Sequence, residues 1–473
     1  MPDPSLASRS LRAGRCSWTP VAALFLLLLA PSALMAQPVE VPDTWGGDFG
    51  SRPRLTGSWG GVRDELGKKG IVFDVDVLLT PQAVVSGGRS TDSDLWGNAE
   101  YTLNIDTQKA GLWPGGFLKL QGNTGFGNNV FKNAGAIVPV NTAALIPGID
   151  LHTTALTNAT FMQFLSEKFG VVFGKFNTFD LGETEFYGNY RTQFLNTAFN
   201  FPITLAQVPV SAWGGGLIVL PTKNLTLTAI ALNPNGTPTS NPVFGDDVMV
   251  LGNAQLAVAP HGLVGHQTIG FVWNDVERYS LEQDPSNIGR LLLSSRFPRL
   301  ANPGPALEQI LKQFFPGLLV PTVPPNMKNS SWTFTYSADQ YLWQPENKPK
   351  QGFGVFFAFG VSDGNPNPIK YAFLGGIGGK GVLPGRANDS FGLGFAYTQF
   401  SSAFVPLLRD RLNLGLENEN AFEMYYNAAL TGWLELSGDL QVVNPGLTKR
   451  LTGTQLTPVS TAIVAGLRLQ VRF

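Results

Sequence analysis

The segment between residues 179 and 200 gathers side chains suited to weak, reversible binding of a polar solute. Charged groups of both signs stand beside aromatic rings there: Asp180, Glu183, Glu185, Phe186, Tyr187, Tyr190 and Arg191. Charged side chains hydrogen-bond polar groups of a solute, and aromatic rings offer flat apolar faces against which another ring can stack. This mixture suits a site that binds polar solutes weakly.

The residues needed for catalysis are scarce. The three histidines, His152, His261 and His266, are far apart, and no nucleophile-elbow, zinc-protease or phosphate-loop motif is present. Asp74 and Asp76 are too close and too parallel to form an acid–base pair across a substrate. We therefore expect no enzymatic activity, and we interpret His266 as a polar residue of an inner wall.

Cysteine usage argues against disulfides and metal centres. The one cysteine, Cys16, precedes the apolar run Val21 to Ala30 and is lost if the leader is removed. No cluster of His or carboxylate residues has the spacing of metal ligands. The sequence predicts no cofactor and no metal, although calcium in an external loop leaves little trace in a sequence.

The composition narrows the class of protein. Charged residues make up 14% of the 473 residues, with 54 Gly and 33 Phe, and the formal net charge is −1. Such an apolar chain is not disordered, has no apolar run long enough for a membrane helix, and lacks the basic character of a nucleic-acid-binding protein. A large β protein or a membrane β protein remains.

The N-terminus resembles an export signal. Basic residues precede the apolar run, and small residues follow it as far as Ala36. This pattern is typical of a secretory signal peptide, so we expect residues 1–36 to be removed and the mature protein to lie outside the cytoplasm. A short anchoring helix is the alternative, but ten apolar residues do not span a bilayer.

The mature chain alternates polar and apolar residues in segment after segment. Successive side chains of a strand point to opposite faces of a sheet, so each such segment predicts a strand with one polar and one apolar face. Most of the segments are as long as the ~9–11 residues of a tilted membrane strand. There are sixteen, at 71–80, 94–106, 115–123, 153–165, 169–178, 210–220, 224–232, 248–258, 262–273, 331–343, 352–363, 370–381, 391–400, 420–430, 433–444 and 461–473.

Periodicity alone does not say which face is wet. In a soluble sandwich the apolar face is the core, whereas in a membrane barrel it faces lipid and the polar face lines the lumen. Strand length, the even strand number, the export signal and the aromatic Phe473 at the end of the last strand favour the barrel. We thus predict an all-β transmembrane antiparallel barrel of about 16 strands over residues 71–473.

The connections and the N-terminal part complete this prediction. Short links alternate with two long connections, 179–209 and 274–330, and barrels place long loops on the outer side of the membrane. Residues 37–70 read as an irregular lead followed by a short helix, with Ser58 as its cap and Gly70 as its end.

Several motifs, in their order along the chain, resemble the carbohydrate-selective porin family (OprB-type porins). They are the Leu-Thr-Gly-Ser-Trp-Gly-Gly…Arg stretch at 55–66, the Phe-Gly-Lys-Phe-Asn-Thr strand at 173–178, the Phe-Leu-Asn-Thr-Ala-Phe segment at 194–199, the Asp-Gly-Asn-Pro-Asn-Pro turn at 363–368, and the closing hairpin from Glu423 to Gly446. The family commonly has Asp where Ser58 stands. The resemblance spans residues 55–473 and implies a sixteen-stranded outer-membrane barrel that passes small sugars.

On that reading, particular residues become candidate sugar contacts. The segment at 179–200 is either a constriction loop folded into the lumen or an exposed external loop. Arg63 beside Trp59 either reaches the lumen or contacts a periplasmic plug. The candidates are Arg63, Trp59, Glu185, Arg191, Tyr187, Tyr190, Lys175, Glu100 and Lys119, and we expect the other wall charges, Glu423, Glu435, Asp439, Arg468 and Arg472, to keep the wall wet.

Alternative functions remain open at this point. A general porin or a porin for acidic solutes would share the barrel, and the latter needs a net basic constriction. An outer-membrane barrel enzyme would need a catalytic constellation that the sequence does not show. The expected partners are small sugars and outer-membrane lipid, without nucleic acid, and the sequence allows either a monomer or a trimer.

Overall fold

A computed structural model describes residues 41–149, 151–240, 243, 245–284, 309, 310, 313, 324–404, 415–452 and 455–473. The predicted signal peptide, residues 1–36, lies outside these residues, so it stays a prediction. Within the described part of the chain, no helix is both long enough and apolar enough to cross a membrane.

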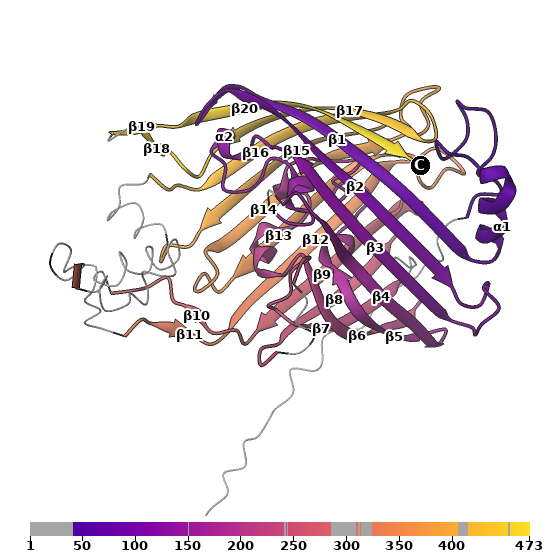
Figure 1. Ribbon diagram of the computed structural model, residues 1–473, viewed down its shortest axis with the longest axis horizontal. Helices are drawn as coiled ribbons and strands as arrows, with labels where there is room; N and C mark the ends of the chain where they lie inside the picture. The colour runs from indigo at the N-terminus through magenta and orange to yellow at the C-terminus, as the bar shows by residue number, and fades with distance from the viewer. Residues whose placement is uncertain are drawn as a thin grey trace, which may run out of the picture.

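Sixteen antiparallel strands form one closed barrel in sequence order, as Figure 1 shows. Neighbours in the sequence are neighbours in the sheet, and β1 pairs with β20 to close it. The barrel strands are β1 Ile71–Gly88, β2 Asp92–Asp106, β3 Gly116–Gly127, β4 Thr154–Ser166, β5 Phe169–Asn177, β6 Ser211–Thr222, β7 Leu225–Leu232, β8 Met249–Val258, β9 Gly265–Asn274, β12 Ser331–Trp343, β13 Gly352–Ser362, β14 Ile369–Lys380, β15 Ser390–Phe400, β16 Glu419–Ala429, β17 Leu434–Asn444 and β20 Ser460–Arg472.

In the described part of the chain, two small two-stranded sheets lie outside the barrel sheet. β10 Arg278–Tyr279 pairs with β11 Met327–Lys328, and β18 Lys449–Thr452 pairs with β19 Gln455–Pro458. The short helices are α1 Val62–Lys68 and α2 Phe131–Ala134, with single 3-10 turns η1 Trp59–Gly61, η2 Thr142–Leu145, η3 Thr178–Leu181, η4 Thr197–Phe199, η5 Ile203–Gln207 and η6 Pro260–Gly262.

The apolar face of the strands points outward, as the barrel interpretation requires. On β12, Trp332 and Phe334 are 38% and 36% exposed, whereas Thr333 between them is fully buried. On β15, Phe395 is exposed and Ala396 is buried. Because the exposed members are large and apolar, the outer surface suits contact with lipid tails rather than with water.

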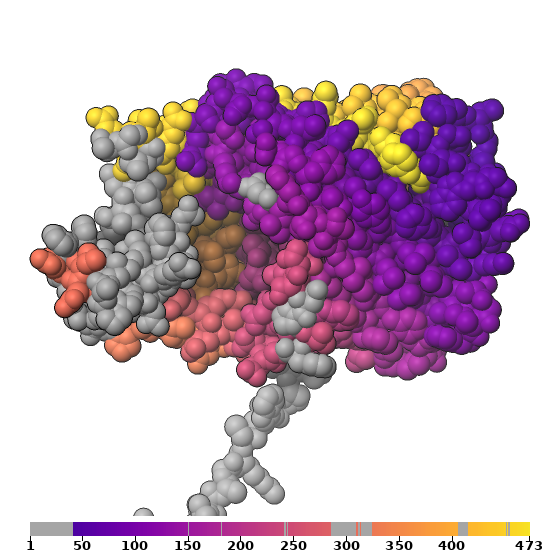
Figure 2. Space-filling view, viewed as in Figure 1, coloured from indigo at the N-terminus to yellow at the C-terminus, as the bar shows by residue number. Residues whose placement is uncertain are grey.

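The two ends of the barrel differ. Short turns, such as 167–168 and 223–224, lie at the end that carries α1, and the long connections lie at the other end (Figure 1). α1 and Phe473 lie at the end with the short turns, which corresponds to the periplasmic end of bacterial barrels. Figure 2 shows the first described residues, in indigo, packed against this end beside the yellow C-terminal strand.

The N-terminal helix is shorter than the sequence predicts. α1 begins at Val62 after the 3-10 turn η1, and the side chain of Ser58 makes no capping hydrogen bond. The carbonyl oxygen of Ser58 instead accepts the backbone N–H of Gly61 and of Arg63. Gly70 follows the helix with a φ of +70°, a left-handed conformation that glycine adopts without strain.

Candidate functional site

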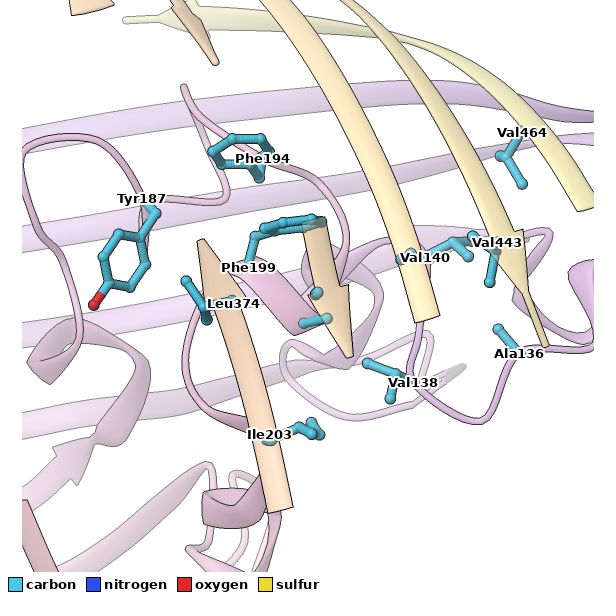
Figure 3. Packing of buried hydrophobic residues seen from close by; sticks show 14 of the residues in the cluster. Ala136, Val138, Val140, Tyr187, Phe194, Phe199, Ile203, Leu374, Val443 and Val464 are labelled. Atoms are coloured by element: carbon cyan, nitrogen blue, oxygen red, sulfur yellow. The ribbon is translucent and has the colours of Figure 1, made fainter. Parts of the chain in front are cut away.

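Two connections fold into the barrel instead of extending from it. We call them L2, residues 128–153 between β3 and β4, and L3, residues 178–210 between β5 and β6. Phe194 and Phe199 of L3 are fully buried, and the ring centroid of Phe194 lies 4.8 Å from that of Tyr425 on β16. Figure 3 shows Phe194 and Phe199 of L3, with Val138 and Val140 of L2, beside strands of the barrel wall. Of the two alternatives for residues 179–200, the structure therefore has the inward one.

Glycines in the wall make room for L3. A Cβ atom at Gly394 of β15 would lie 2.6 Å from Cε1 of Phe199, and one at Gly392 would lie 2.7 Å from Cζ of Phe194. Real Cβ atoms do not approach other atoms so closely, so only glycine lets the aromatic rings of L3 lie flat against this part of the sheet. Part of the high glycine content thus reflects the docking of L3.

The inner faces of β2 and β3 carry charged side chains that form ion pairs with side chains of L3. Lys119 of β3 forms an ion pair with Asp180 of L3, with Nζ and Oδ2 2.6 Å apart, and Arg191 of L3 pairs with Glu100 of β2. Glu100 also accepts a hydrogen bond from Gln121 Nε2 at 2.6 Å. We call Lys119, Asp180, Arg191 and Glu100 the strip. Each of its two basic side chains pairs with one of its two acidic side chains.

All four charged groups of this strip keep part of their surface open. The side chains of Lys119, Asp180, Arg191 and Glu100 are 34%, 21%, 21% and 11% exposed. Burial acts to lower the pKa of Arg191, but the nearby Glu100, Tyr190 and Asp180 groups together outweigh burial and raise that pKa above its ordinary value. Arg191 is therefore a permanent cation whose charge is offset locally by Glu100.

Glu185 lies farther along L3 against a different wall. Its Oε2 accepts a hydrogen bond from the Tyr341 hydroxyl of β12 at 3.0 Å. Burial, followed by the nearby Asp339 carboxylate, raises the pKa of Glu185 above its ordinary range. Nδ1 of His266 lies 2.8 Å from Oδ1 of Asp339, so His266 belongs to a wall contact, in keeping with its interpretation as a polar wall residue.

The tyrosines of L3 are not placed as the sequence suggests. Tyr187 and Tyr190 are 2% and 4% exposed, so neither ring presents a free face for stacking on a sugar. The Tyr187 ring packs on Phe356, with centroids 5.2 Å apart, and burial raises the pKa of both phenols. The apolar surface of the two rings packs L3 against the wall. From the sequence alone, an aromatic residue used for packing cannot be told apart from one that stacks on a ligand.

Lys175 does not line an open lumen. It is 1% exposed, and its Nζ donates a hydrogen bond to the carbonyl oxygen of Pro238 at 2.8 Å. Asn177 on the same strand is also buried, and its side chain accepts the N–H of Phe179 to begin η3. Both residues shape the entry of L3 into the barrel.

Arg63 and Trp59 lie at the periplasmic rim. Arg63 is 2% exposed, and its guanidinium donates to Asp74 Oδ1 at 2.7 Å and to the backbone oxygen of Phe473 at 3.1 Å. The guanidinium carbon lies 4.8 Å from the centroid of the Trp59 ring and 5.3 Å from that of Trp45. Of the two alternatives for Arg63, this geometry favours the periplasmic contact, which ties the N-terminal segment to the β1–β20 seam.

Several wall charges that we expected to be wet are buried. Glu423 of β16 and Arg468 of β20 are 0% and 1% exposed, and both bind the backbone of L3. Polar periodicity identifies their face correctly but does not show that a loop covers it. Near the rim, Arg472 and Glu435 form an ion pair with 24% and 10% of their side chains exposed. Among the described residues, no group of three His, Cys, Asp or Glu side chains could hold a metal ion.

Comparison with known proteins places the chain in a family. Residues 92–473 match the model of the carbohydrate-selective porin, OprB family. The high-pH structure of OprB from Pseudomonas putida superposes with a TM-score of 0.71 at 20% identity, covering 90% of this chain and 100% of that one. Its low-pH structure gives a TM-score of 0.52 at 16% identity, with 90% and 99% covered. A search of curated protein sequences found no match.

Proposed function

We propose a path for the solutes of this chain, which belongs to the carbohydrate-selective porin family and is a sugar porin of the outer membrane. In this proposal, uncharged small sugars diffuse past the strip where L3 meets β2 and β3. One observation carries this proposal: the part-exposed charges of that strip, Lys119, Asp180, Arg191 and Glu100, are paired one to one inside the barrel. The strip therefore offers hydrogen-bond donors and acceptors with little net charge.

This arrangement suits a neutral, hydroxyl-rich solute. A sugar leaving bulk water needs replacement hydrogen bonds, each contributing ~1 kcal/mol net, and paired Arg, Lys, Glu and Asp side chains supply donors and acceptors side by side. The ion pairs also orient these groups before the sugar arrives. Such contacts are weak enough to release the solute, as conduction requires.

The pairing also bears on the competing porin functions. A porin for acidic solutes needs excess positive charge at its narrow point, and here Arg191 and Lys119 each have an acidic partner. The geometry therefore supports neutral sugars over sugar acids. The path lies within one chain, so the proposal holds for a monomer and a trimer alike.

Reconstitution in lipid tests the proposal. We expect the mature protein to form channels in planar bilayers, and glucose and a disaccharide to reduce the current reversibly. In liposome-swelling assays, glucose should enter faster than gluconate, which is an anion, and faster than glucosamine, which is a cation. Absence of conductance would contradict the pore itself, whereas faster entry of gluconate would support the acidic-solute alternative.

Location in the outer membrane has separate support. The exposed outward residues of β12 and β15, including Trp332, Phe334 and Phe395, form an apolar outer surface that suits lipid. An export signal over residues 1–36 would deliver the chain across the inner membrane. Fractionation of cells expressing the full chain, with N-terminal sequencing of the product, measures both the location and the cleavage site.

A further inference from the structure

One wall strand holds both inward loops by their backbones. β16 carries Glu419 and Glu423 four residues apart, hence on the same inward face of the strand. The Oε1 atom of Glu423 accepts the N–H of Leu195 at 2.5 Å, and its Oε2 accepts the N–H of Asn196 at 3.0 Å. Both carboxylate oxygens are thus used on consecutive amides of L3.

Glu419 makes the corresponding contact with L2. Its Oε2 accepts the N–H of Ile137 at 2.7 Å, and its Oε1 accepts the N–H of Val138 at 2.9 Å. The N–H of Gly446 adds a third hydrogen bond, to Oε2 at 2.8 Å. A carboxylate that receives several backbone N–H groups forms charge-assisted hydrogen bonds, which are stronger than bonds between neutral groups.

A third wall residue holds L3 through its carbonyl groups. Nη1 of Arg468 on β20 donates to the carbonyl oxygen of Tyr190 at 2.7 Å and to that of Gln193 at 2.8 Å. Tyr190 is next to Arg191 in the chain, so this contact fixes the backbone that presents Arg191 to Glu100. The wall therefore binds both the N–H and the C=O groups of L3.

The two loops are also joined to each other. The N–H of Thr142 in L2 donates to the carbonyl oxygen of Leu195 at 2.8 Å, and the N–H of Thr197 in L3 donates to that of Pro139 at 2.9 Å. Leu195 thereby takes part in the Glu423 contact through its N–H and in the L2 contact through its C=O. Releasing L3 from Glu423 removes an anchor next to the point where L2 supports it.

We propose that Glu423 is the principal positioning residue of the channel: it sets the pore width by holding L3 across the lumen, without contacting the sugar. Glu419 acts in the same way on L2, and through L2 more weakly on L3. The role in selectivity rests on the proposed function, whereas the role in holding L3 is structural and can be tested separately.

The first test measures loop attachment through a buried cysteine. If residues 1–36 are removed, the mature chain holds no cysteine, so Thr197→Cys, at a position 1% exposed, reports whether L3 stays docked. We expect Glu423→Gln to raise the rate of maleimide labelling at this site more than tenfold. The amide NH₂ group of glutamine cannot accept a hydrogen bond, so one of the two L3 N–H groups that Glu423 binds loses its acceptor. Glu419→Gln should raise the rate less.

Glu435→Gln is the matched control. Glu435 lies on the same side of the barrel, on β17, and its partners are Asn427 and Arg472, which belong to neighbouring strands. This variant should label like the parent. Equal labelling of the Glu423→Gln and Glu435→Gln proteins would overturn the proposal.

A change within L3 keeps the test valid if Glu423→Gln does not fold. Asn196 has a φ of −65°, which matches proline, so Asn196→Pro removes the N–H that Glu423 accepts without changing a strand. Asn196→Ala, the control, removes only the side chain. Faster labelling of the proline variant than of the alanine variant supports the contact, and equal labelling contradicts it.

The second test measures the consequence for selectivity. In bilayers, Glu423→Gln should increase the conductance and its fluctuations and should raise the entry of a trisaccharide relative to glucose by severalfold, with Glu435→Gln unchanged. Unchanged selectivity despite faster labelling would show that L3 does not set the pore width. If the parent forms no channel, the proposed function fails, while the labelling result on L3 still stands.

Discussion

L3 is held by two parts of the barrel wall in two different ways. At β2 and β3, its side chains form ion pairs with Glu100 and Lys119 that stay partly exposed. At β16 and β20, buried Glu423 and Arg468 bind its backbone. Exposed pairs exchange partners readily and contribute little stability, whereas a buried charge that loses its partner is costly. The first wall is therefore suited to solutes and the second to structure.

Of the changes that test this comparison, we expect Arg468→Ala to lower the free energy of unfolding the most. Arg468→Ala leaves the Tyr190 and Gln193 carbonyls without their donor and leaves Asp439 and Glu423 without the nearby cation. We expect a loss of about 3–5 kcal/mol in the free energy of unfolding, as for other broken buried charge contacts. Heat-modifiable gel migration and urea titration measure the loss.

Arg472→Ala serves as the control for that change. Arg472 pairs with Glu435 near the rim with 24% of its side chain exposed, and it does not bind L3 in the described structure. Its loss should cost ~1 kcal/mol or less. Similar losses for the two arginines would remove the distinction between the walls.

The next effect concerns the glycines that receive L3. Gly394→Ala places a methyl group 2.6 Å from Phe199 Cε1, so the ring has to move and L3 with it. We expect a cost of about 1–3 kcal/mol, typical of overpacking, together with altered sugar block. Gly438→Ala, at a site with open space around the added Cβ, is the control for added β propensity.

At the solute-facing wall we expect a change in transport rather than in stability. Arg191→Ala should weaken sugar block by severalfold, about 1 kcal/mol for one lost hydrogen bond, and should make the channel prefer cations because Glu100 loses its partner. The unfolding free energy should change by less than ~1 kcal/mol. A large loss of stability without a change in block would reverse the roles of the two walls.

The smallest expected effect is a pH dependence at Glu185. Its raised pKa means that the protonated form is favoured in the folded barrel, beside Asp339, Tyr341, His266 and Lys380. The contribution of Glu185 to L3 docking is thus fully present below its ordinary pKa and declines as the pH rises through the raised value. Open-channel noise should therefore increase from pH 4 to pH 8.

Glu185→Gln imitates the protonated form and should weaken this dependence. The variant should be as quiet at pH 8 as the parent is at pH 4. If the noise of the parent and of the variant follows pH identically, the dependence belongs to other groups, such as His266 and Asp339.

The sequence by itself determined the barrel. Alternation within one strand is a local property, since each residue's face follows from its neighbours along the chain. It therefore predicted sixteen strands, each overlapping a barrel strand such as β2 or β17. Strand length, the even strand number and the export signal then favoured a barrel with its apolar face outward, as Trp332 and Phe334 show. Charged and aromatic residues also marked 179–200 as a segment of interest.

Only the tertiary structure decided what covers the inner face. Glu100 and Arg191 form an ion pair although they are 91 residues apart in the chain, and Glu423 binds the N–H of Leu195 although these two residues are 228 residues apart. No periodicity encodes such contacts, because alternation shows the face of a residue but neither its depth along the barrel nor the loop folded against it. For that reason Glu100 and Glu423, both polar residues of alternating strands, look alike in the sequence, although the Glu100 side chain keeps 11% of its surface exposed beside Arg191 and Glu423 is fully buried under L3.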